Sequence, residues 1–75
     1  MKEKIDYLST LFVGIDIASR IHVISALDFN QEYFIKMKPV ENTQEGAILL
    51  EGMVVDVLKE NPHFKYVVIG MESTG

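Results

Sequence analysis

The chain of 75 residues contains no cysteine, so disulfide bridges and thiolate metal ligands are excluded and the redox compartment stays open. Carboxylates and imidazoles are the metal ligands that remain. No apolar run approaches the ~20 residues that a membrane-spanning helix needs. Residues 1–6 are largely charged and lack the apolar core of a secretion signal. These absences lead us to expect a cytoplasmic protein.

Basic residues are also scarce, since seven Lys and Arg stand against eleven Asp and Glu, for a formal net charge of −4. Nucleic-acid binding depends on clustered Lys and Arg, and this chain has no such run. If the protein binds nucleic acid, the basic groups for that binding therefore have to come from another source. The hydrophobic fraction of 48% indicates a folded core. A chain this short forms one small domain and buries only about 60% of its unfolded surface.

Hydrophobic patterning predicts four strands and one amphipathic helix. We expect strands over residues 11–17, 21–27, 32–38 and 65–71, and the helix over about 43–60. Residues 1–10 are weakly patterned, and we expect a flexible arm there. The run 11–17 is almost wholly apolar, which is typical of a strand covered on both faces.

Turn-forming and helix-capping residues set the expected boundaries of the strands and the helix. The short break at residues 18–20 predicts a hairpin. Asn30 is the best candidate for a left-handed backbone in the next turn, and Pro39 is expected to end the third strand. That strand is expected to form an edge of the sheet, with one face exposed to solvent. Asn42 or Thr43 is expected to cap the helix.

The order strand, strand, strand, helix, strand predicts an α/β fold with a mixed sheet. A crossover helix before the last strand makes that strand parallel to a sheet member that need not be its sequence neighbour. If strand 4 lies beside strand 1 and parallel to it, the sheet order is 3-2-1-4. The carboxyl ends of these two strands then meet at one edge of the sheet.

Asp16 and Glu72 end two similar segments, FVGID (residues 12–16) and VIGME (residues 68–72). Each segment is an apolar run, a glycine, one apolar residue and a carboxylate. A charge at the end of a buried strand is costly unless water, a partner or a metal ion receives it. Neighbouring strands lie ~4.8 Å apart, so the two carboxylates can share a cation if strand 4 lies beside strand 1. The pattern indicates a shared site at which Asp16 and Glu72 bind a metal ion.

Simpler interpretations of these residues remain open. Asp16 can cap the turn at residues 18–20, and Glu72 can be a first-turn acid of a helix starting at residues 73–75. Both roles can coexist with metal binding. We assign His22 no catalytic role, because a lone histidine in an apolar strand is usually packed or partly exposed.

Glycines and methionines favour structural roles. Gly14 and Gly70 can admit a metal or a nucleic-acid backbone, yet a strand glycine more often permits close packing, which we expect here. Met37, Met53 and Met71 are interpreted as ordinary core fillers.

The segment FVGIDIASRIHVISALD, followed about a helix later by YVVIGMESTG, resembles the start of the insertion-sequence-110 family of DNA transposases, which have an Asp-Glu-Asp-Asp (DEDD) active site. The resemblance covers about Leu11 to Gly75. It implies the opening half of a ribonuclease H-like fold, similar to the RuvC Holliday-junction resolvase, and therefore the mixed sheet order 3-2-1-4 with strand 4 parallel to strand 1. By this resemblance, Asp16 and Glu72 are catalytic residues: Asp16 is the first acid of the tetrad and Glu72 is the second.

The resemblance also implies what this chain does not contain. The last two acids, the fifth strand, the later helices and a downstream domain with a serine nucleophile would follow Gly75. We therefore expect residues 11–75 to be the amino-terminal half of a RuvC-like domain that cleaves DNA strands during transposition and recombination. Mg²⁺ would be the cofactor of the complete domain. Asp16 and Glu72 supply only half of the four acidic ligands, so we expect weak or no Mg²⁺ binding and no activity from this chain alone.

In the full-length family, the implied partners are DNA and a structured RNA encoded by the element. Two other functions remain as alternatives. Sugar kinases and actin-like ATPases open with a similar unit, but they place a glycine after the aspartate to hold phosphate, and residues 17–20 have none. A non-catalytic module is the second alternative, in which the strand edge at residues 65–71 drives self-association.

Overall fold

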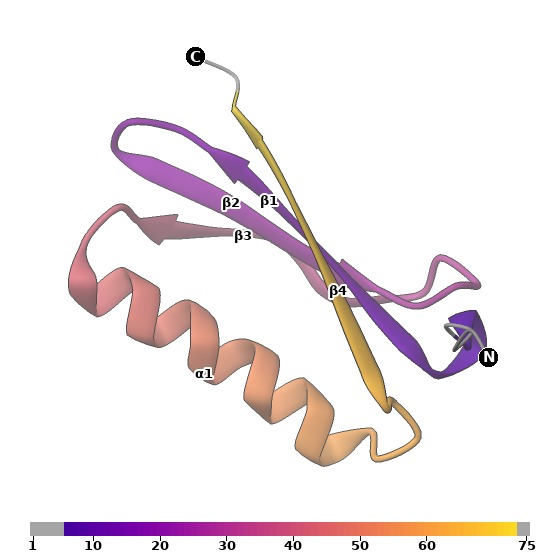
Figure 1. Ribbon diagram of the computed structural model, residues 1–75. Helices are drawn as coiled ribbons and strands as arrows, with labels where there is room; N and C mark the ends of the chain where they lie inside the picture. Colours follow the sequence, from indigo (N-terminus) through magenta and orange to yellow (C-terminus); the bar gives the residue numbers. More distant parts are fainter. Residues whose placement is uncertain (1–5, 74–75) are drawn as a thin grey trace, which may run out of the picture.

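The computed structural model describes residues 6–73, which form one four-stranded sheet with a helix against one face (Figure 1). The strands lie in the order β3-β2-β1-β4, and β1 is parallel to β4 while the other pairs are antiparallel. The predicted α/β class, strand order and parallel pair are confirmed. The elements are η1 (Tyr7–Ser9), β1 (Thr10–Ile17), β2 (Ile21–Leu27), β3 (Tyr33–Glu41), α1 (Gln44–Glu60) and β4 (Tyr66–Ser73).

The hydrophobic core lies between α1 and one face of the sheet. Side chains alternate along β1, so that Val13 and Ile15 are buried while Gly14 and Asp16 on the opposite face are exposed. The expectation that residues 11–17 are covered on both faces is therefore wrong, because a single helix covers only one. The buried core comprises Leu11, Val13, Ile15, Ile24, Ala26, Ile35, Val40, Val57 and Phe64.

The start of the described chain packs against the base of β1. Asp6 caps η1, and the Thr10 hydroxyl donates to the Asp6 carbonyl at 2.6 Å. The Tyr7 ring stacks on Phe12, with centroids 6.3 Å apart. Within the segment expected to be an arm, residues 1–5 lie outside the described residues, whereas Thr10 is wholly buried and belongs to β1.

β3 is an edge strand, as expected, but it does not end at Pro39. It continues to Glu41, and Pro39 pairs with Val23. A proline fits here because an edge strand can turn the position of the missing N–H toward solvent. A bulge at residues 36–37 interrupts the register opposite Ser25, and Met37 there has a left-handed φ of 50°.

The β2–β3 turn places its left-handed residue one position later than predicted. Gln31 has a φ of 66°, and Asn30 does not have a positive φ. The reason is local: the Gln31 N–H donates to the Asp28 carbonyl at 3.0 Å, and the Glu32 N–H donates to the Asp28 carboxylate at 2.9 Å. These two bonds fix the turn around Asp28.

α1 is capped as the sequence predicts. Of the two expected caps, Thr43 takes the position, and its Oγ1 accepts from the Gly46 N–H at 3.0 Å. Asn61 caps the other end, where its backbone N–H donates to the Val57 carbonyl. Among the described residues, no helix is both long enough and apolar enough to cross a membrane.

Candidate metal site at the ends of β1 and β4

Asp16 and Glu72 are direct partners in the parallel pairing of β1 with β4. Two positions earlier, Gly14 pairs with Gly70 in the same register. The two similar strand endings therefore match residue for residue, and their carboxylates leave the backbone from neighbouring positions ~4.8 Å apart. The structure brings the two acids together as expected, while their catalytic role remains a prediction.

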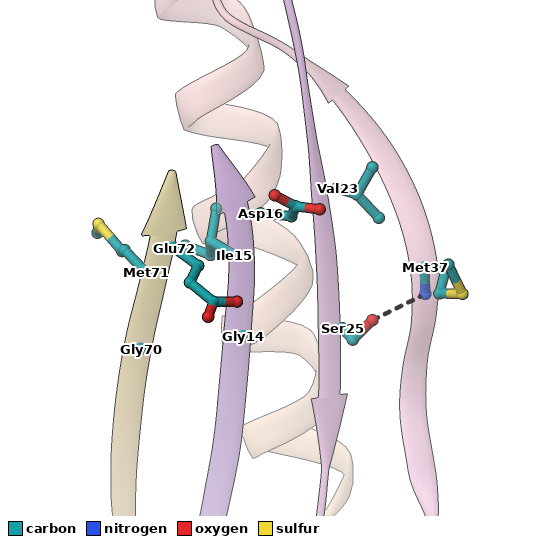
Figure 2. Close-up of a pocket in the computed structure, with 9 residues that line it drawn as sticks. All are labelled: Gly14, Ile15, Asp16, Val23, Ser25, Met37, Gly70, Met71 and Glu72. Carbon is teal, nitrogen blue, oxygen red and sulfur yellow. Dashed lines mark hydrogen bonds between the residues drawn. The ribbon is translucent and has the colours of Figure 1, made fainter. Parts of the chain in front are cut away.

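Both carboxylates lie on the sheet face that α1 leaves uncovered. Figure 2 shows the Glu72 side chain extending from β4 toward β1, and the Asp16 carboxylate turned toward Val23 on β2. The turn after β1 is held by His22, whose Nδ1 accepts from the Ala18 N–H at 3.1 Å. This bond gives His22 a structural role and takes the place of the turn cap considered for Asp16.

The interpretation of Glu72 as a first-turn acid also changes. Ser73, where a helix was considered, is the last residue of β4, and residues 74–75 lie outside the described residues. Up to Ser73 the chain is extended and continues the pairing with Ile17. Glu72 thus projects from a strand.

Exposure changes the energetic argument for the pair. Asp16 and Glu72 are both exposed, and so is every residue of β4. Water solvates the two charges, so the expected cost of burial does not arise in this chain. What remains is the repulsion of two like charges on paired positions, which is worth roughly 0.2–1 kcal/mol at an exposed site. A cation bound between them would relieve that repulsion.

A groove of about 570 Å³ lies beside the carboxylates on the same face. Gly14 and Gly70 form part of its lining, and a Cβ added at either glycine would have no atom within 4 Å. The expectation that these glycines serve close packing is therefore wrong: they leave the backbone open to an occupant of the groove. The lining residues are Gly14, Ile15, Asp16, Val23, Ser25, Met37, Gly70, Met71 and Glu72.

Sequence reasoning missed Ser25 and Met37 as groove residues. Ser25 pairs with Gly14, and its Oγ accepts from the Met37 N–H at 3.2 Å across the bulge (Figure 2). Met37 is 68% exposed and Met71 is 65% exposed, so neither is a core filler, in contrast to the partly buried Met53. A serine within the apolar strand 21–27 was an available signal for the groove. The sequence carries no comparable signal for the bulge, because methionine does not favour the positive φ that Met37 adopts there.

The charged residues of the groove have the chemistry that a hard divalent cation requires of its ligands. Asp16 and Glu72 supply carboxylate oxygens, which Mg²⁺ prefers. Among residues 6–73, no group of three or more His, Asp or Glu side chains is placed to hold a metal ion. A Mg²⁺ ion bound by these two carboxylates would keep water in most of its coordination positions.

Comparisons of the chain with models of known families, with curated proteins and with solved structures found no match.

Proposed function

We propose that this chain is the amino-terminal part of a ribonuclease H-like, RuvC-like catalytic domain of the insertion-sequence-110 type. In this proposal, Asp16 and Glu72 are two of its metal-binding carboxylates. The observation that supports it most is their pairing at the carboxyl ends of two adjacent parallel strands. Sheets of α/β proteins commonly bind ligands outside the carboxyl ends of their strands. The strand order 3-2-1-4 is also the order that the sequence resemblance implies.

The chemistry of DNA strand cleavage suits these residue types. Mg²⁺, when bound, stabilises the attacking and leaving oxygens of a phosphoryl displacement. Asp16 and Glu72 would hold the ion, and the open backbone at Gly14 and Gly70 would let a sugar-phosphate chain approach the sheet. The net charge of −4 of residues 1–75 opposes a phosphate backbone, so the bound cation and basic groups outside these 75 residues would have to offset it.

Two carboxylates make a weak site, so the test needs a probe that reports low occupancy. Mn²⁺ takes the same oxygen ligands as Mg²⁺ and broadens nearby NMR signals through its unpaired electrons. We expect Mn²⁺ added to the ¹⁵N-labelled chain to broaden the amide signals of residues 14–17 and 71–73 first. Excess Mg²⁺ should restore them.

Asp56 gives a matched control, because it is an exposed acid on α1, away from the groove. Asp16→Asn should abolish the selective broadening, and Asp56→Asn should leave it unchanged. Broadening that is no stronger at residues 14–17 than around Asp56 would count against a metal role for the pair. Tight, stoichiometric Mg²⁺ binding would contradict the view that the site is half built.

A further inference from the structure

The two edges of the sheet are protected very differently. β3 carries Lys36, Lys38, Pro39 and a bulge, which are the usual devices against pairing with another chain. Within residues 6–73, β4 is the other edge strand: it pairs with β1 in unbroken register, and its outer edge is exposed and apolar over most of its length. Val68, Ile69 and Met71 are 38%, 52% and 65% exposed. An edge of this kind is a template for another strand.

We propose that β4 pairs antiparallel with β4 of a second copy, about a twofold axis that passes through Ile69. Paired residues of a continuous sheet point to the same face, so the axis has to pass through a residue and not between two. An axis at Ile69 places Ile69 opposite its own copy and Val67 opposite Met71. On the other face, Val68 lies opposite Gly70.

Charge favours the same register. Glu72 is the one charged residue in β4, and an axis at Ile69 places it opposite Tyr66 of the second copy. The two Glu72 residues are then six positions apart along the ladder, about 20 Å, which exceeds the Debye length of about 8 Å at physiological salt. An axis at Gly70 would instead set Glu72 against the apolar Val68. The Ile69 register therefore pairs apolar residues and keeps the like charges apart.

The pairing would join both sheets into one. A twofold axis perpendicular to the sheet preserves its faces, so both copies of α1 would lie on one side and both grooves on the other. An eight-residue edge spans about 26 Å, and its contact area falls below that of a standard stable interface. We therefore expect a weak dimer whose population rises with protein concentration.

Sedimentation equilibrium of the chain from about 5 μM to 1 mM tests the association. Ile69→Lys should weaken it at least about tenfold, because the substitution sets two ammonium groups face to face. Ile48→Lys is the matched control: Ile48 is an isoleucine of α1 with 64% exposure, and its substitution should leave the dimer unchanged. A monomer throughout, or equal weakening by both substitutions, would overturn the proposal.

Cysteine cross-linking tests the register independently of the lysine variant. The chain has no cysteine, so each introduced thiol reports alone. Paired positions in an antiparallel ladder lie about 4.5–5.5 Å apart, within the Cα range of a disulfide. Ile69→Cys should give the most disulfide-linked dimer under mild oxidation, well above Val68→Cys and Gly70→Cys. Preferential linkage at position 70 or 68, or equal linkage at all three, would overturn the proposed axis.

Discussion

Replacing Gly14 or Gly70 with alanine should stabilise the chain, although both glycines line the candidate site. A strand glycine is usually kept because a neighbour packs against it or because the backbone needs a positive φ. Neither reason applies here. An added Cβ would meet no atom within 4 Å at either position, and no glycine within the described residues has a positive φ.

The magnitude follows from the backbone entropy that glycine loses on folding. Glycine in a strand interior is about 0.5–1 kcal/mol less favourable than alanine. For a domain of this size, the gain corresponds to a rise in melting temperature of about 2–8 °C. Total stabilities near 0.05–0.15 kcal/mol per residue make such a change easy to detect.

Gly46 provides the opposite case within the same chain. It is buried at the start of α1, and a Cβ there would overlap the Glu41 carbonyl oxygen and lie 2.9 Å from the Glu41 carbonyl carbon. The overlap is with backbone, which cannot swing away as a side chain can. Gly46→Ala should therefore destabilise the chain by about 1–3 kcal/mol, despite the better helix propensity of alanine.

Urea denaturation followed by circular dichroism measures all three variants on one scale. Destabilisation by Gly14→Ala and Gly70→Ala as large as that by Gly46→Ala would refute this expectation. That outcome would mean that the two strand glycines are kept for packing, and the groove would lose its open backbone. If both alanine variants are more stable than the original chain, glycine at these positions does not serve stability, and access to the groove is the remaining reason for it.

The remaining predictions concern the cap, the core and an alternative function. Thr43→Ala removes the hydrogen bond to the Gly46 N–H and should cost about 1 kcal/mol in urea denaturation, whereas Thr43→Ser should retain most of the stability. Leu11→Ala empties a position with no exposed surface and should cost about 2–5 kcal/mol, and a loss below about 1 kcal/mol would contradict the core described. ATP with Mg²⁺ should not raise the melting temperature, because the turn at residues 18–20 has no phosphate-binding glycine; a clear rise would favour the kinase-like alternative.

Much of the fold follows from the sequence because local and global signals agree. The strand at residues 21–27 is observed with its predicted bounds, and Thr43 caps the helix as one of two expected residues. The repeated pattern predicts that Asp16 and Glu72 meet if strand 4 lies beside strand 1, and β4 does pair with β1 in that register. That pairing fixes the position of the candidate site.

The errors come from features that patterning does not encode. Hydrophobicity alone does not say whether a second layer covers a strand. For this reason the sequence predicts burial of residues 11–17 on both faces, and with it a high free-energy cost for the charges of Asp16 and Glu72. Pro39 was expected to end a strand, yet it fits an edge position. Met37 leaves the core because a bulge shifts it by one position, and a bulge depends on the partner strand as well as on local sequence.

A double-mutant cycle of Asp16→Asn and Glu72→Gln, with and without Mg²⁺, tests the central claim most directly. The two carboxylates occupy paired positions, so at low ionic strength the cycle should give a repulsive coupling of about 0.2–1 kcal/mol. Mg²⁺ at about 10 mM should cancel or reverse the sign of that coupling, because a shared cation stabilises the intact pair. A coupling of zero, or a repulsion that Mg²⁺ leaves unchanged when ionic strength is matched with Na⁺, would contradict a shared metal site.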